Sequence, residues 1–237
     1  MSIRNIKAIF FDYDDTLVLV KDARRDALNN IARILSEKYS LNLDTVINTL
    51  LRIEQKMEIS GIFNRDLWWR EALTQFNITH VPTYELEKLT EIYWNTWAHK
   101  TLPQQYALET LYELKRCGYI LGLIANTDGK PGLKIKRLEK GPIPLSLFNL
   151  IIIAGDDTKE IKPSPEPFIV ALNRLNLRGD ECMYVGDKAY SDVPGAKAVN
   201  MLTVLLTDEP LYGLDPKPDM TIRSLKELLD ILDCHKT

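Results

Sequence analysis

The chain has few of the residues that build metal centres from nitrogen and sulfur ligands. Its 237 residues include only three histidines, which have no metal-ligand spacing, and three cysteines. Cys117, Cys182 and Cys234 are odd in number and widely spaced, with no C-x-x-C pair. This pattern argues against a zinc site and predicts buried or free reduced thiols, as is usual in the cytosol.

Long apolar runs and a strong net charge are also missing. The longest apolar stretches, residues 145–154 and 120–125, are much shorter than the roughly 20 residues needed to span a bilayer. Residues 1–4 lead directly into a strand-like run, without the apolar region of a secretory signal. The formal net charge of −3 argues against a nucleic-acid partner. We therefore expect a cytoplasmic monomer or homodimer that binds neither nucleic acid nor a membrane.

Short apolar runs that alternate with helical segments dominate the chain outside residues 18–102. Five runs predict parallel strands that are buried on both faces: residues 6–11, 119–125, 150–154, 182–185 and 201–206. Residues 106–117 predict a helix that ends at Gly118, and Ser164 and Pro165 predict the N-cap and first residue of the next helix. This alternation predicts an α/β fold with a doubly wound parallel sheet.

The connection after the first strand is long and helical. The apolar spacing predicts four helices, at residues 22–39, 43–59, 64–76 and 83–99. Asn42, Asn64 and Thr83 are their predicted N-caps. We therefore predict a helical insert at residues 18–102, hinged at residues 18–20 and 100–103. The α/β core then consists of residues 1–17 and 103–237.

Two aspartates stand where the first strand is expected to end. Asp12 and Asp14 are two residues apart in extended backbone, so their side chains point the same way. Two carboxylates held together repel unless a proton or a cation lies between them. Because open α/β sheets bind ligands at the carboxyl ends of their strands, this pair predicts a site of chemistry.

Three further motifs follow the ends of later strands. In chain order they contribute Ala125, Asn126 and Thr127; then Lys162; and then Asp187 and Asp192. Parallel strands bring their carboxyl ends to one edge of the sheet, so we expect these residues to converge on the aspartate pair. So many carboxylates at one edge need a hard cation, and oxygen ligands alone favour Mg²⁺.

In the order and strand-end context of these motifs, the chain resembles the haloacid dehalogenase-like (HAD) superfamily. The resemblance covers residues 6–206 and is closest to the phosphatase-like subgroup with a helical cap inserted after the first motif. It implies a Rossmann-like core and an aspartyl-phosphate formed on Asp12. It also implies that Asp14 is the general acid and base. Lys162 is implied to offset the charge of Asp12 and of the phosphate.

The resemblance also implies a ligand set. The Asp12 carboxylate, the Asp14 carbonyl and Asp187 would bind Mg²⁺ directly, while Asp192 would hold metal-bound water or Lys162. The residues implied to bind the phosphate of the substrate, together with Lys162, are Thr16, Ala125, Asn126 and Thr127.

The second acid favours one reaction over its relatives. An alkoxide leaving group needs a proton and a halide does not, so Asp14 favours a Mg²⁺-dependent phosphatase that acts on a small phosphorylated metabolite. Haloacid dehalogenases lack this aspartate, and sugar-phosphate mutases usually carry Val at the position of Thr16. The family usually has Ser or Thr at the position of Ala125, so a catalytically weakened phosphate-ligand binder is a further alternative.

The predicted insert carries three groups of side chains whose roles differ. Its tryptophans lie at helical spacing and are predicted to be core rather than a platform for substrate: Trp68, Trp69, Trp94 and Trp97. The loop residues Phe63, Asn64 and Arg65 are hypothesised to contact the substrate beyond its phosphate. The basic residues of this region and of the segment after the second motif are predicted to lie on the surface: Arg24, Arg25, Lys134, Lys136 and Arg137.

Overall fold

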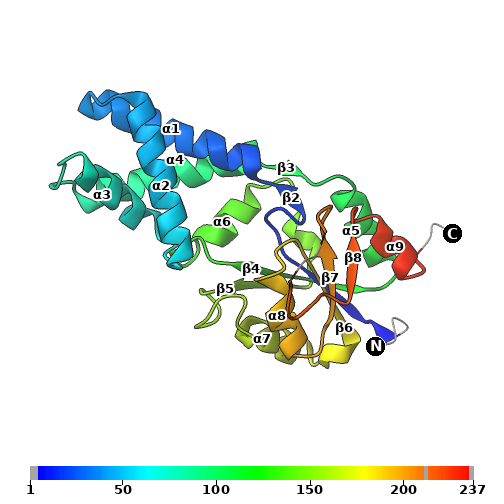
Figure 1. Ribbon diagram of the computed structural model, residues 1–237. Coiled ribbons are helices and arrows are strands. Elements are labelled where there is room, and N and C mark those ends of the chain that lie inside the picture. Colours follow the sequence, from blue (N-terminus) through cyan, green and yellow to red (C-terminus); the bar gives the residue numbers. More distant parts are fainter. Residues whose placement is uncertain (1–4, 211–212, 235–237) are drawn as a thin grey trace. The chain divides into compact units, whose positions relative to one another are not determined.

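The computed structural model of the chain describes residues 5–210 and 213–234 (Figure 1). It divides into two compact units. The first, here called the core unit, comprises Met1–Leu19, Leu102–Thr127 and Pro142–Thr237. The second, the helical unit, comprises Val20–Thr101 and Asp128–Gly141. This division differs from the predicted one chiefly at residues 128–141, which pack with the helical unit.

The core unit is built on a parallel sheet with the strand order β5-β4-β1-β6-β7-β8. These strands are β1 (Ala8–Phe11), β4 (Ile120–Asn126), β5 (Leu150–Ala154), β6 (Cys182–Gly186), β7 (Leu202–Leu206) and β8 (Met220–Ile222). The chain winds outward from β1 in both directions, so the predicted doubly wound fold class is confirmed. The edge strand β8 was not predicted, because a three-residue strand is too short to give a periodic pattern.

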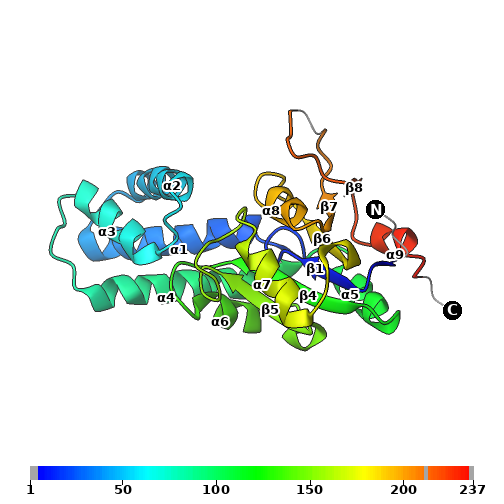
Figure 2. The same cartoon turned by 90° about the horizontal axis from the view of Figure 1, so that it is seen from below.

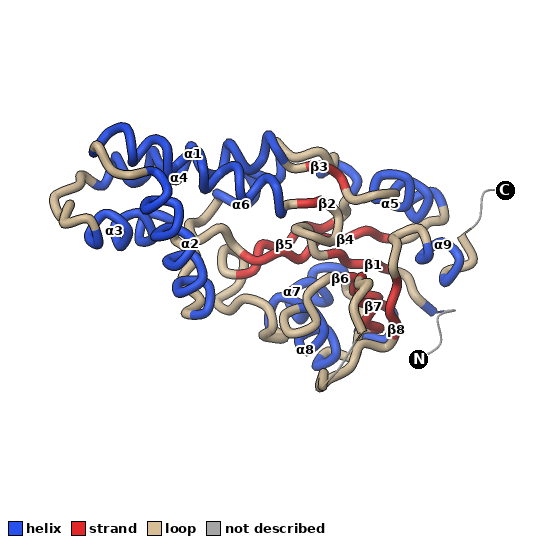
Figure 3. The backbone as a smooth tube through the Cα atoms, turned by 45° about the horizontal axis from the view of Figure 1, so that its top comes forward, coloured by secondary structure: helices blue, strands red, loops and turns tan. Residues whose placement is uncertain are grey.

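Helices cover both faces of this sheet. They are α5 (Ala107–Arg116), α7 (Glu166–Leu175), α8 (Asp192–Ala198) and α9 (Glu227–Ile231), with 3-10 turns at Leu145–Leu147 and Gly179–Glu181. Figure 3 shows α7 and α8 on one side of the sheet and α5 and α9 on the other. Beneath α7 and α8, Phe10 of β1 and Tyr184 of β6 are paired in register and pack in one buried cluster with Phe168.

Two features at the helix ends test local predictions. Gly118, after α5, has the left-handed φ of +89° predicted for a helix terminator. The predicted start of α7 was wrong by one residue, because Pro165 and not Ser164 is its N-cap. The Ser164 hydroxyl accepts a hydrogen bond from the backbone N–H of Glu166 at 3.2 Å. Boundaries of this kind shift easily because the first turn lacks intrahelical hydrogen bonds.

The helical unit consists of α1 (Lys21–Tyr39), α2 (Leu43–Ile59), α3 (Arg65–Gln75), α4 (Thr83–Lys100) and α6 (Leu133–Glu139). Helices α1 and α4 lie side by side (Figure 2), joined by a 3.0 Å hydrogen bond from Asn30 to Thr96. Where the predicted hinges lie, β2 (Val18–Leu19) pairs antiparallel with β3 (Leu102–Pro103).

The N-caps of this unit bear out two of three predictions. The side chains of Asn42 and Asn64 each accept a backbone hydrogen bond at 3.0 Å, from Thr45 and Asp66 respectively. The third prediction was wrong, because the N-cap of α4 is Pro82 and Thr83 is its first helical residue.

Tryptophans form the core of the helical unit. Trp68, Trp69, Trp94 and Trp97 are at most 6% exposed, which confirms their predicted structural role. The Arg65 guanidinium lies 3.4 Å from the centroid of the Trp68 ring and is itself buried. Arg65 is buried and the side-chain carbonyl of Asn64 caps α3. The contact of Phe63, Asn64 or Arg65 with a substrate stays a prediction.

Two basic residues of α6 are buried rather than exposed. Arg137 is 4% exposed, and its guanidinium donates two hydrogen bonds to Asp128, at 2.7 and 3.0 Å. The Lys134 ammonium is 3.7 Å from the same carboxylate. The prediction that Lys134 and Arg137 lie on the surface was therefore wrong. The helical spacing of basic residues alone does not reveal a buried carboxylate nine residues away.

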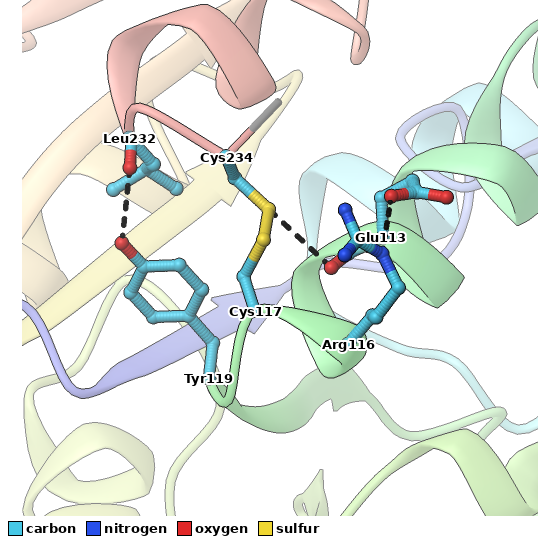
Figure 4. Close-up of a disulfide and its surroundings, with 6 residues drawn as sticks. All are labelled: Glu113, Arg116, Cys117, Tyr119, Leu232 and Cys234. Atoms are coloured by element: carbon cyan, nitrogen blue, oxygen red, sulfur yellow. Dashed lines mark hydrogen bonds and ion pairs between the residues drawn. A yellow bond between two sulfur atoms is a disulfide. The ribbon is translucent and has the colours of Figure 1, made fainter. Parts of the chain in front are cut away.

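A disulfide corrects the prediction of reduced thiols. Cys117, after α5, is bonded to Cys234, after α9, with their Cα atoms 6.1 Å apart (Figure 4). Beside it, the Tyr119 hydroxyl donates to the carbonyl of Leu232 at 3.3 Å. Cys182 is a free, buried thiol, and burial raises its pKa to about 12. The two bonded cysteines are 117 residues apart, so only the tertiary structure could pair them.

Candidate active site

Asp12 stands directly beyond the carboxyl end of β1. Its backbone N–H donates to the carbonyl of Val185 in β6 at 2.9 Å, which extends the parallel pairing by one residue. The neighbours of β1 on its two sides are β4 and β6, so Asp12 lies where the winding direction of the sheet reverses. Such switch points are where open α/β sheets bind ligands. Asp12 is 7% exposed.

The Lys162 ammonium is buried against Asp12. It donates to Asp12 Oδ1 at 2.6 Å, to Asp192 Oδ1 at 2.7 Å and to the hydroxyl of Tyr184 at 2.7 Å. The side chain of Asn126, at the end of β4, accepts from the backbone N–H of Lys162 at 2.9 Å and donates to its carbonyl at 3.4 Å. The second and third motifs are therefore tied together directly.

The fourth motif adds two carboxylates. Asp187 follows β6, and its Oδ1 accepts a hydrogen bond from the Thr16 hydroxyl at 2.9 Å. Asp192 begins α8, and its Oδ2 accepts from the backbone N–H of Lys188 at 3.0 Å. Gly186 makes this approach possible, because a Cβ atom at that position would overlap the Asp192 carboxylate.

Asp12, Asp187 and Asp192 form a cluster that could hold a metal ion. One carboxylate oxygen from each lies within 4.8 Å of the others. Burial, followed by the charges of Asp12 and Asp192, raises the pKa of Asp187 to about 7, although the nearby Lys188 lowers it. Burial also raises the pKa of Asp192. Crowded oxygen donors of this kind fit a hard divalent cation, which would relieve their mutual repulsion.

Two residues predicted to bind phosphate, Thr127 and Ala125, have no side-chain hydroxyl directed to a ligand in this conformation, because the Thr127 hydroxyl bonds to Asp156 and Ala125 has none. The Thr127 hydroxyl donates to Asp156 at 2.6 Å, and its backbone N–H donates to the carbonyl of Ala154 at 2.8 Å. Ala125 is buried in β4 and has no side-chain donor. In this conformation the second motif therefore contributes chiefly through Asn126, which holds Lys162.

Asp14 lies in the turn after β1, where it makes an isolated β-bridge with Val18. It is half-buried, and it is not a member of the three-carboxylate cluster. Its charge contributes, after those of Asp12 and Asp187, to raising the pKa of Lys188. The acid and base role implied for Asp14 stays a prediction.

Two residues of the site were not predicted. Tyr184 is 1% exposed and contacts Lys162, and Lys188 has its ammonium 4.0 Å from Asp187. The sequence could have indicated Tyr184, since a tyrosine in an otherwise apolar strand has a buried hydroxyl that must find a hydrogen-bond partner. It could have indicated Lys188 as a cation that directly follows Asp187 in the sequence.

Within the described part of the chain, no helix is both long and apolar enough to cross a membrane.

Comparisons with known proteins agree with this geometry. A family model described as haloacid dehalogenase-like hydrolase matches residues 6–200. A glyceraldehyde 3-phosphate phosphatase from Pyrococcus furiosus is 33% identical, over 97% of this chain and 94% of the relative. A phosphoglycolate phosphatase from Colwellia psychrerythraea is 28% identical, over 91% and 90%. The crystal structure of a HAD phosphatase from Thermococcus onnurineus is 29% identical, covers 98% of this chain and all of its own, and has a TM-score of 0.72.

Proposed function

Because the chain belongs to the haloacid dehalogenase-like hydrolases, we propose that it is a Mg²⁺-dependent phosphatase that acts through an aspartyl-phosphate on Asp12. The observation that carries the proposal is the convergence of Asp12, Lys162 and Asp187 from three separate strand ends. The buried Lys162 ammonium is shared between Asp12 and Asp192, so it does not pair with Asp12 alone. This arrangement suits an Asp12 carboxylate that attacks and accepts a phosphoryl group.

In the proposed first step, an Asp12 carboxylate oxygen attacks phosphorus and the bond to the ester oxygen breaks. Asp14 gives its proton to the departing oxygen, which leaves as an alcohol. In the second step, Asp14 takes a proton from water, whose oxygen attacks phosphorus and frees the Asp12 carboxylate with inorganic phosphate. Lys162 stabilises the charge that develops on the phosphoryl oxygens.

Asp12 and Asp187, with the carbonyl of Asp14, are the proposed ligands of Mg²⁺. The ion would neutralise the carboxylates and the incoming phosphate. The oxygen-only donor set and the raised pKa of Asp187 support this assignment.

The proposed substrate is a small phosphorylated metabolite, with glyceraldehyde 3-phosphate as the first candidate because the relative from Pyrococcus furiosus is a phosphatase of that compound. 2-Phosphoglycolate is the second, from the relative of Colwellia psychrerythraea. The helical unit is the proposed cap that selects the leaving group. We propose a monomer or homodimer of the cytoplasm, with no nucleic acid or membrane as partner.

The test is phosphate release from a panel of esters, with and without Mg²⁺. The panel contains glyceraldehyde 3-phosphate, 2-phosphoglycolate, sugar phosphates, nucleoside monophosphates and pyrophosphate. A haloacid, 2-chloropropionate, is added to test for halide release. We expect turnover of a short-chain phosphate ester that EDTA abolishes and Mg²⁺ restores. Halide release, or phosphate binding without turnover of any ester, would contradict the proposal and favour the dehalogenase or the weakened binder.

A further inference from the structure

Tyr184 is a buried polar side chain to which the sequence motifs assign no role. It lies in β6, two residues before Gly186, and is 1% exposed. Its ring packs edge-on against Phe168, with centroids 5.0 Å apart. The ring is therefore fixed by apolar packing, which leaves the hydroxyl little freedom to move.

The hydroxyl lies at the centre of a small hydrogen-bond network. It accepts from the Lys162 ammonium at 2.7 Å and lies 3.1 Å from Asp192 Oδ1 and 3.2 Å from the carbonyl of Ile124. A phenol has one proton, so it donates to either Asp192 or Ile124 while it accepts from the lysine. Burial, and then the charge of Asp192, raises the pKa of Tyr184, which keeps this proton in place.

These contacts define the position of the ammonium completely. Lys162 has three N–H donors, and its three acceptors are Asp12, Asp192 and the Tyr184 oxygen. Of these, the tyrosine oxygen is the only neutral one. Without it, one proton of a buried ammonium would lack a partner, or the ammonium would move toward one carboxylate.

We propose that Tyr184 is a positioning residue that holds the Lys162 ammonium at Asp12 throughout the reaction. The inference rests on the proposed function, in which Asp12 changes from a carboxylate to an acyl phosphate. The tyrosine oxygen undergoes no such change, so it keeps the ammonium in place when its contact with Asp12 is altered. Asn126 fixes the main chain of Lys162, and Tyr184 fixes its head group.

The first experiment compares Tyr184→Phe with the wild-type chain. Phenylalanine keeps the ring and its packing against Phe168, and removes only the oxygen. We expect kcat per folded molecule to fall about tenfold, the loss of one hydrogen bond to a charged group, while KM rises no more than severalfold. The control is Tyr93→Phe, at another fully buried tyrosine, in the helical unit; its kcat should equal that of the wild type.

The second experiment asks whether the effect passes through Lys162. The affinity for inorganic phosphate in the presence of Mg²⁺ is measured by calorimetry for Tyr184→Phe, Lys162→Met and the double variant. We expect Tyr184→Phe to weaken phosphate binding severalfold in the wild-type background and not at all in Lys162→Met. This coupling is not expected from a purely structural role, which would weaken both backgrounds equally.

The outcomes separate this inference from the function on which it depends. Mg²⁺-dependent turnover in the wild type, together with an unchanged kcat in Tyr184→Phe, overturns the positioning role alone. Equal effects of Tyr184→Phe in both Lys162 backgrounds also overturn it. No turnover of any phosphate ester by the wild type overturns both proposals.

Discussion

Buried charge is arranged in opposite ways in the two units of this chain. In the helical unit, one carboxylate, Asp128, is held by the two guanidinium hydrogen bonds of Arg137 and lies near Lys134. The guanidinium also packs over Trp94 and Trp97, 5.0 and 5.2 Å from their ring centroids. Each charge there has a partner, as a stable buried pair requires.

The core unit holds the reverse arrangement. There the buried Lys162 ammonium pairs with two of three clustered carboxylates, and the third, Asp187, lies near the partly exposed Lys188 and has its pKa raised to about 7. Negative charge is in excess, which destabilises the folded chain unless a cation or a proton is bound. Buried charge by itself therefore marks no site: a cluster whose single carboxylate is held by cations stabilises a fold, and one with surplus carboxylates is prepared for chemistry.

The largest effect is expected from the cluster with surplus carboxylates. Asp12→Asn preserves size but removes the nucleophile, so we expect phosphate release to fall at least about a thousandfold. Intact-mass measurement after incubation with substrate should find no phosphorylated chain. The matched control is Asp180→Asn, at an exposed carboxylate of the same unit. Near-normal turnover in Asp12→Asn would remove Asp12 from the chemistry.

The cluster around Asp128 is expected to control stability instead. Arg137→Met leaves the Asp128 carboxylate buried without its guanidinium, which should lower the free energy of unfolding by about 3–5 kcal/mol. Urea unfolding measures the loss. Lys136→Met, at an exposed neighbour on the same helix, should change stability by less than about 0.5 kcal/mol. Equal stabilities of the two variants would mean that the Asp128 pair is not structural.

The disulfide locates further stability in the core unit away from the active site. Cys117 precedes β4 at its amino end, whereas the site lies at the carboxyl ends of the strands. Replacing Cys117 and Cys234 by serine should lower the free energy of unfolding by about 2–4 kcal/mol without changing the affinity for Mg²⁺.

Thiol titration of the unfolded chain checks the same bond. One thiol, that of Cys182, is expected before reduction and three after it. Three thiols without reductant would restore the prediction of a reduced chain. Since disulfides are uncommon in the cytoplasm outside hyperthermophiles, the result also bears on the proposed location.

A pH-dependent effect is expected from the cost of ionising Asp187 in the metal-free protein. Its pKa rises from 3.8 to about 7 on folding, so the folded chain retains a proton that the unfolded chain releases. The stability contributed by this group therefore decreases as the pH rises from about 4 to about 7 and is constant above that.

Asp187→Asn removes this cost. At pH 8 without metal, the variant should be more stable than the wild type by up to about 4 kcal/mol, with the difference vanishing toward pH 4. Mg²⁺ should raise the melting temperature of the wild type but not of the variant. A variant that is less stable at pH 8 would contradict the raised pKa.

Much of the core unit was predictable, for a physical reason. Strands buried on both faces must be continuously apolar, so β5 was predicted to the residue and β4 to within one. The same logic placed Asp12, Lys162 and Asp187 at one edge, because parallel strands end together. Helices α1 to α4 of the helical unit followed from their apolar spacing, and α2 was predicted to the residue, whereas α6 was not predicted.

The failures share a cause. The Cys117–Cys234 disulfide, the burial of Lys134 and Arg137, and the hydroxyl of Tyr184 all depend on partners distant in sequence or on another element. Neither spacing nor composition contains that information. The assignment of residues 128–141 to the helical unit is of the same kind, since it depends on which surface α6 packs against.

The sequence by itself determined which strands end in functional motifs, and that these motifs carry more acidic than basic residues, because periodicity and residue type are local properties. Only the tertiary structure decided which charges are paired. In the core unit, Asp12 and Asp192 share the Lys162 ammonium and Asp187 lies near that of Lys188. In the helical unit, one carboxylate is shared by two cations. Pairing is set by distances between segments that the chain brings together only on folding.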